Sequence, residues 1–374
     1  MSFSSIIESD LRDLAAEVKR KAPEIKKDAE SGIETLLVLV KKHPSNIKKM
    51  RSTDYVTPFI DCLNNEKVSE KAHEIAVRGL HNIVSYNLVS DATASTIVDI
   101  LNDRLDSEDS SSELGIHILN IFPIMIANCS FIIPERKLQS ILCHLAMILC
   151  SEEASSPIFE SAQSCLYEFC SSLHKQVSVY STENVKKSTS KVYDSFREKA
   201  PKTLSDNSYA VAYWSLLQDL IARLTEQNAA WISNGGDFQA VALSPFMCAE
   251  LLLKCLESDA NVLLNRIEFS SLFNYLFVNA SVALLKDEKT DPELIAVTLT
   301  ATQILFTRFT AMISAIPVAL DAISEKIHHW LKKKKSLNPT RCLLLQFLRG
   351  VFSDKQFFVT CLSTWSRSEE RRVG

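Results

Sequence analysis

Glycine is scarce in this sequence, and that scarcity limits the folds that it can adopt. The chain contains 7 glycines among 374 residues, whereas average usage is about 7%. Hairpin turns and phosphate-binding loops rely on glycine because it takes positive φ angles at no steric cost. The one glycine pair, Gly235-Gly236, belongs to no GxGxxG or GxxxxGK motif. The sequence therefore disfavours β and α/β folds and a nucleotide site, and it favours helices joined to helices.

Ser, Asp, Asn or Pro opens the segments with helical hydrophobic periodicity, which is typical of helix N-termini. The connections between these segments are short, and pairs of segments recur about every 40 to 45 residues, which is typical of armadillo and HEAT repeats. The predicted fold class is all-α, with armadillo/HEAT-like helical hairpins stacked into an elongated solenoid. The polar segment 199–207 predicts a boundary between two helical-repeat regions, 1–200 and 208–374. The predicted helices are 4–21, 24–42, 53–65, 68–87, 90–106, 112–128, 135–151, 156–175, 183–199, 208–231, 243–257, 261–286, 292–315, 317–335, 339–352 and 354–365.

One uncharged stretch, Leu114 to Pro134, has the length of a membrane span. It includes His117 and Asn120, whose polar side chains are costly in hydrocarbon, and Pro123, which disrupts a helix. We therefore expect a buried central helix. The N-terminus meets Glu8 and Asp10 before any apolar run and so lacks the pattern of a signal peptide, which predicts a cytoplasmic protein.

The ten cysteines predict reduced, buried thiols, because they occur singly in apolar helical segments of a chain too large to need disulfides. The pairs Cys143/Cys150 and Cys248/Cys255 are separated by about 10 Å of helix, too far to share one zinc ion. The eight histidines form no HExxH motif, and no GxSxG motif occurs. We predict no metal, no cofactor and no enzymatic activity.

Three basic clusters stand out against a net charge of −4. In the first, Lys19 to Lys21 with Lys26 and Lys27, acidic residues are interleaved, which favours a solvated helix surface. The second and third clusters are candidates for anionic lipid, since each nearby Lys or Arg contributes about 1 kcal/mol at such a surface. An aromatic anchor precedes the lysines of the third cluster, as at membrane interfaces. The candidate residues are Lys41, Lys42, Lys48, Lys49 and Arg51, and Trp330, Lys332, Lys333, Lys334, Lys335 and Arg341.

Four segments resemble one family in the same order along the chain. They are ESDLRDLAAEVKRKAPEIKKDAESGI at 8–33, WSLLQDLIARLTEQNAAW at 214–231, EFSSLF at 268–273 and NPTRCLLLQFLRGVFSD at 338–354. The sequence is similar to the N-terminal region of the monensin-sensitivity (Mon-two) family, non-catalytic relatives of the large Arf exchange factors. Region 1–200 resembles the DCB part of that region, and region 208–374 resembles its HUS part.

The resemblance implies a peripheral scaffold of the trans-Golgi network and endosomes. It further implies an Arf-like small GTPase, a Dopey-type protein and a phospholipid flippase as partners, and a homodimer. The alternative interpretation is a helical-repeat cargo or RNA adaptor, which would need a base-reading pattern in each repeat or a continuous basic face. The sequence shows neither pattern, so no nucleic-acid partner is expected.

Overall fold

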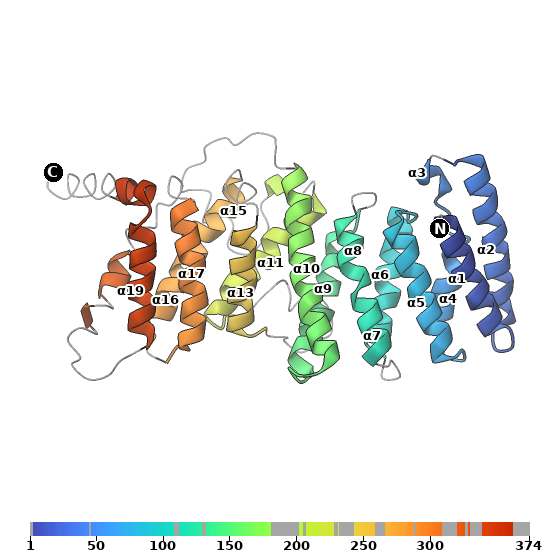
Figure 1. Ribbon diagram of the computed structural model, residues 1–374, viewed down its shortest axis with the longest axis horizontal. Helices are drawn as coiled ribbons and strands as arrows, with labels where there is room; N and C mark the ends of the chain where they lie inside the picture. The colour runs from blue at the N-terminus through green and yellow to red at the C-terminus, as the bar shows by residue number, and fades with distance from the viewer. Residues whose placement is uncertain are drawn as a thin grey trace. The chain divides into compact units, whose positions relative to one another are not determined.

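The chain forms two compact units, Met1–Gln176 and Val177–Gly374. The computed structural model describes residues 3–44, 46–107, 112–128, 132–180, 202–204, 207–227, 231, 243–258, 266–287, 289–308, 320–325, 328–329 and 339–361. Within these ranges every regular element is a helix (Figure 1). The predicted all-α fold of stacked helices is confirmed.

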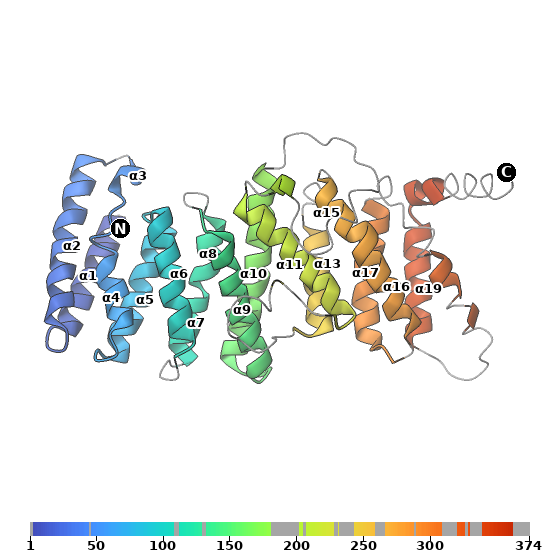
Figure 2. The same ribbon diagram turned by 180° about the vertical axis from the view of Figure 1, so that it is seen from behind.

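In unit 1 the helices stack in two layers. Helices α1, α5, α7 and α8 form one layer, and α2, α4, α6 and α9 form the other (Figures 1 and 2). The bounds are α1 Phe3–Val18, α2 Pro23–Lys42, α3 Ile47–Met50, α4 Thr57–Asn64, α5 Glu70–Ser85, α6 Asp91–Leu105, α7 Ser112–Leu119, α8 Ile121–Ala127, α9 Glu135–Ser151 and α10 Pro157–Tyr180. Most of these bounds follow the predicted ranges closely. The exceptions are the short α3, which the sequence pattern missed, the predicted helix 112–128, which is divided into α7 and α8, and α10, which runs five residues beyond the predicted 175.

Helix ends in this chain are built largely without glycine. The Ser69 and Ser90 hydroxyls each accept a hydrogen bond from a backbone N–H in the first turn of α5 and α6, both at 3.2 Å. After α5 the left-handed position is taken by Asn87, with φ of 63°, and the N–H of Leu88 returns to the carbonyl of Ile83. No described glycine has a positive φ. The few glycines therefore serve other purposes.

One such purpose is close packing between helices. A Cβ atom on Gly79 of α5 would lie 2.3 Å from the ring of Phe59 on α4, which is fully buried. Gly32 of α2 similarly lies in close contact with the backbone of Asp54 and Tyr55. Glycine at these positions lets neighbouring helices approach until side chains from both fill the core.

Carbonyl groups at helix C-termini are satisfied by side chains of the following repeat. Arg104 of α6 donates to the Leu63 carbonyl at the end of α4. Asn128 donates to Val84 at the end of α5, and Gln176 of α10 donates to Ile126 of α8, both at 2.8 Å. Carbonyls in the last turn lack an intrahelical partner, so at these three positions a side chain from a later helix adds to the hydrogen bonding of an earlier one; the Val84 carbonyl also accepts from the Asn87 N–H.

The predicted helix 112–128 is in fact two short helices, α7 and α8, separated at Asn120. Pro123 has no N–H to donate to the carbonyl of Leu119, and its ring would clash with that group in a straight helix. The Cys165 thiol of α10 donates to the Leu119 carbonyl instead, at 3.1 Å. In the described part of the stretch 114–134, Leu119, Phe122 and Ile126 are fully buried, whereas His117, Asn120 and Ile132 are exposed, so the expected buried helix is found only in part.

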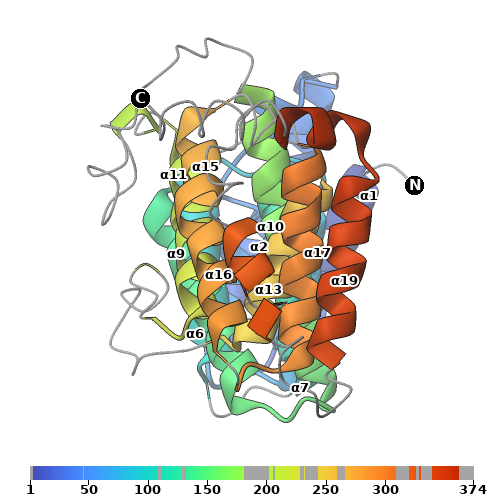
Figure 3. The same cartoon turned by 90° about the vertical axis from the view of Figure 1, so that its left-hand side faces the viewer.

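Unit 2 is also helical. Its core is aromatic, with Trp214, Phe269 and Phe306 buried, and α16, α17 and α19 lie side by side in Figure 3. Residues 272–277 form a π-helix, η3 Leu272–Phe277, that the sequence pattern did not reveal. The other bounds are η2 Lys202–Leu204, α11 Ser208–Leu224, α13 Pro245–Glu257, α15 Ile267–Ser271, α16 Val278–Lys286, α17 Pro292–Arg308 and α19 Pro339–Phe352.

Helix α11 ends seven residues before the predicted 231, because Glu226 adopts a left-handed φ of 57° and Gln227 N–H bonds back to Ala222. The predicted helix 183–199 lies outside the described residues, as does most of 317–335. The proposed region boundary at 199–207 also falls mainly outside them and stays a prediction.

Candidate functional site

The buried histidines are used as structural hydrogen-bonding groups. The His73 ring contacts the Asn65 carbonyl at 3.2 Å and the Arg104 guanidinium at 3.1 Å, and burial together with that guanidinium lowers the pKa of His73. His144 lies 2.8 Å from Asp106 and 2.7 Å from the Ser140 carbonyl. The described part of the chain holds no cluster of three His, Cys, Asp or Glu side chains placed to share a metal ion.

Most described thiols are buried as predicted, but Cys150 and Cys342 are exposed. For these two the expectation of burial is wrong, because they lie on the outer faces of α9 and α19. Burial raises the pKa of Cys62 to about 12 and that of Cys255 to about 11. Neutral thiols are poor nucleophiles, so these buried cysteines serve packing.

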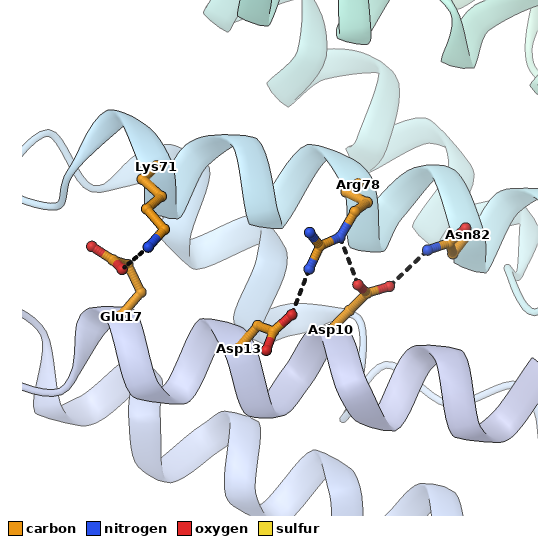
Figure 4. Close-up of polar contacts among 6 residues, drawn as sticks. All are labelled: Asp10, Asp13, Glu17, Lys71, Arg78 and Asn82. Atoms are coloured by element: carbon orange, nitrogen blue, oxygen red, sulfur yellow. Dashed lines mark hydrogen bonds and ion pairs between the residues drawn. The ribbon is translucent and has the colours of Figure 1, made fainter.

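A hollow of about 370 Å³ lies beside α5 and α7, and His81 and His117 are among its lining residues. Its cations, Lys71 and Arg78, are already paired with carboxylates of α1: Lys71 with Glu17, and Arg78 with Asp10 and Asp13 (Figure 4). The hollow also carries Glu74. These carboxylates outnumber the cations, so the hollow offers no net attraction for an anion.

Four lysines gather where α2 ends and α3 follows. Lys41 and Lys42 occupy the last turn of α2, and Lys48 and Lys49 lie on α3. All four side chains are exposed, and none takes part in an ion pair among the described residues. The second predicted cluster therefore contains four solvated, uncompensated positive charges near one corner of unit 1.

Buried residues of α2 and α3 hold the four lysines in place. Helix α2 buries one face, including Ile25, Ala29 and Leu36, and so turns its opposite face outward. Helix α3 is held by the buried Met50, whose carbonyl accepts a hydrogen bond from the Tyr55 hydroxyl at 2.7 Å. The Asn46 side chain caps α3 by accepting from the Lys49 N–H at 3.2 Å.

Three large apolar side chains are exposed among these lysines. The exposed fractions are 45% for Leu37, 61% for Val38 and 44% for Ile47. Sequence reasoning missed them, because the run LLVLVKK reads as continuous core. The available signal was their position: Leu37 and Val38 lie off the helical stripe defined by Ile25, Ala29 and Leu36. We call Leu37, Val38, Lys41, Lys42, Ile47, Lys48 and Lys49 the α2–α3 surface.

The remaining candidates are placed differently. Arg51 is only half exposed, and its Nε donates to the Asn87 carbonyl at 3.1 Å, so this group helps to join the end of α3 to the end of α5. Arg341 is half-buried on α19. Trp330, Lys332, Lys333, Lys334 and Lys335 lie outside the described residues, so the third cluster stays a prediction.

Comparison with known proteins adds to this picture. Residues 1–179 match the family model described as the Mon2/Sec7/BIG1-like dimerisation and cyclophilin-binding domain. A stretch of 98 residues is 30% identical to the protein MON2 homolog of Xenopus laevis; it makes up 25% of this chain and 6% of that protein. The chain therefore matches a small part of its much longer relative.

Among the residues that the structure describes, no helix combines the length and apolar composition needed to cross a bilayer. The helical array, the family model and the likeness to the Xenopus protein agree with the resemblance seen in the sequence. Residues 1–179 of this chain therefore form a DCB domain of the Mon2/Sec7/BIG1-like kind.

Proposed function

We propose that this chain is part of a non-enzymatic scaffold that regulates vesicle trafficking between the trans-Golgi network and endosomes. The support is the DCB domain at residues 1–179, which relates the chain to trafficking proteins. An array of stacked helices presents extended surfaces suited to docking other proteins. The proposed partners are an Arf-like small GTPase, a Dopey-type protein and a phospholipid flippase.

The chain also contacts anionic membranes directly, as a peripheral protein. The observation that carries this step is the set of four exposed lysines at the α2–α3 surface, which have no ion-pair partner among the described residues. At about 1 kcal/mol for each cation near an anionic surface, four lysines give useful recruitment that still needs a second contact for stable residence. The lysines at 332–335 form a second proposed lipid contact.

Vesicle co-sedimentation tests the lipid contact. Reversal of Lys41, Lys42, Lys48 and Lys49 to Glu should lower affinity for phosphatidylserine-containing vesicles at least about 100-fold at low salt. The matched control is reversal of Lys19, Arg20, Lys21 and Lys27, which are equally exposed and change the net charge by the same amount. Equal losses in both variants would show only a general charge effect and would refute a contact at α2–α3. Reversal of Lys332 to Lys335 tests the other cluster.

Two further measurements test the protein partners. Capture of the chain by an Arf-like GTPase loaded with GTP, and weak capture by the GDP form, would support a GTPase-binding scaffold. Equal capture by both forms would contradict that part of the proposal. The family is described as a dimerisation domain, and we propose a homodimer, which sedimentation equilibrium would detect as a doubled mass.

A further inference from the structure

We infer that the α2–α3 surface inserts Leu37, Val38 and Ile47 into the bilayer, while its four lysines bind anionic headgroups. The inference rests on the proposed lipid contact of the same surface and assigns a different role to each kind of side chain there. A surface held by charge alone would have no use for three exposed apolar residues of this size. Their exposure among uncompensated lysines is the observation that requires an explanation.

The positions of these residues on α2 fit an interfacial helix end. At about 100° per residue, Leu37, Lys41, Val38 and Lys42 follow one another around an arc of about 140° on the exposed side. The arc alternates apolar and basic side chains over about 7.5 Å of helix axis, which is comparable to the depth of about 5–10 Å that interfacial helices reach. Lysine stems can lie along the apolar surface while their ammonium groups stay at headgroup level.

Helix α3 extends the same surface beyond the end of α2. Ile47 opens this helix with its side chain exposed, and Lys48 and Lys49 follow it, while Met50 turns inward. The single turn of α3 is pinned by the Asn46 cap and the Tyr55 hydroxyl. Because its backbone is already ordered, α3 adds an apolar and two basic contacts without the cost of folding on the membrane.

Charge decides between a membrane and a second copy of the chain. A two-fold contact through this surface would place four lysines opposite four lysines of the other copy, and like charges facing one another in an interface are unfavourable. Anionic lipid supplies the opposite charge and the apolar phase together. The nearest acidic residue on the exposed side of α2 is Glu34, about one helical turn before Val38, and it limits how far the helix can enter.

The test separates insertion from electrostatic attraction. In the apolar variant Leu37, Val38 and Ile47 are changed to Ser and all lysines remain. The control variant changes Leu345, Val359 and Ile132 to Ser; these are one Leu, one Val and one Ile with exposures of 49%, 64% and 57% at other places on the chain. A third variant changes Lys41, Lys42, Lys48 and Lys49 to Gln.

Binding to vesicles of phosphatidylserine and phosphatidylcholine is measured by co-sedimentation, and penetration by the pressure rise of a monolayer of the same lipids. We expect the apolar variant to lose at least about tenfold in affinity, which corresponds to ~1.4 kcal/mol, and to lose the pressure rise. The control variant should match the wild type in both measurements. Changing Glu34 to Gln should strengthen binding and penetration.

Each other outcome overturns a distinct statement. If the apolar variant binds and penetrates as the wild type does, while the Gln variant loses binding, insertion is wrong and the proposed electrostatic contact stands. If neither variant changes binding, the proposed lipid contact at α2–α3 is wrong as well. If the apolar variant keeps full lipid binding but loses self-association in sedimentation equilibrium, the surface belongs to a second copy, and insertion is again refuted.

Discussion

Arg78 of α5 donates from its Nε to the carboxylate of Asp10 on α1 at 2.8 Å, and the Asp10 side chain is buried although the Arg78 side chain is half exposed. The second oxygen of Asp10 accepts a hydrogen bond from Asn82 at 2.7 Å. Arg78 also reaches Asp13 at 2.7 Å, but Asp13 is itself 51% exposed (Figure 4). One guanidinium therefore joins α1 to α5 through a buried and an exposed carboxylate.

The buried carboxylate should matter more to stability. Asp10→Ala should lower the free energy of unfolding of unit 1 by about 1–3 kcal/mol, because Asn82 and Arg78 lose a desolvated acceptor. Asp13→Ala should cost about 1 kcal/mol or less, because water competes for an exposed ion pair. All four tryptophans lie at 214–365, in unit 2, so the measurement is native-state hydrogen exchange of α1 amides. Equal effects of the two substitutions would contradict this ranking.

The contact between Gly79 and Phe59 predicts a second difference. Gly79→Ala should destabilise unit 1 by about 1–3 kcal/mol, because the new Cβ meets a fully buried ring that cannot move aside. The control is Gly115→Ala, where the nearest atom is the terminal methyl of the half-buried Ile158, at 2.9 Å. There the better helix propensity of alanine, worth about 1 kcal/mol, should offset the contact. Thermal unfolding followed by circular dichroism would compare the two variants.

His73 should make unit 1 sensitive to mild acid. Its pKa is lowered in the folded protein, so the unfolded chain binds the extra proton first as the pH falls. The contribution of His73 is complete above the unfolded value of about 6.5 and declines as the pH falls from there toward the lower folded pKa. Hydrogen exchange of α5 amides at pH values above and below this point measures the change. His73→Gln should show a smaller loss, and an unchanged loss would refute the assignment.

Thiol reactivity should follow burial. Cys150 and Cys342 should react with a maleimide in the native protein much faster than Cys62, Cys165 and Cys255, because burial raises the pKa of each of these three thiols. Mass spectrometry of peptides after a short labelling time would give the rate for each cysteine. Rapid labelling of Cys165 would contradict its hydrogen bond to the Leu119 carbonyl.

The repeating helices were predictable because their signals are local. N-cap residues such as Ser69 and Ser90 and the spacing of Ile25, Ala29 and Leu36 locate the helices from sequence neighbours alone. The interruption at Asn120 is different, because its stability depends on Cys165, a donor 46 positions away from the carbonyl it satisfies. Pro123 indicates in the sequence that the helix is interrupted, but the sequence does not identify Cys165 as the donor to the Leu119 carbonyl.

The candidate surface was predictable only in its charges. Lys41 to Lys49 are visible as a cluster in the sequence. The exposure of Leu37, Val38 and Ile47 depends on which face of α2 packs against α1 and α4, and apolar residues occur on both faces near the helix end. Arg51 looks equivalent to the four lysines in the sequence, but in the structure its Nε donates a hydrogen bond to the Asn87 carbonyl.

The capping of helix ends by the next repeat has a consequence for cooperativity. The carbonyls of Leu63 in α4 and Ile126 in α8 keep these side-chain partners only while α6 and α10 are folded in place. The Val84 carbonyl of α5 would lose Asn128 but keep its hydrogen bond from the Asn87 N–H. Stability in stacked repeats is largely a sum of nearest-neighbour terms, and these side chains strengthen the coupling between neighbours in one direction along the chain. Loss of α10 would therefore loosen α8, then α5, so that damage at one end of unit 1 spreads toward the other.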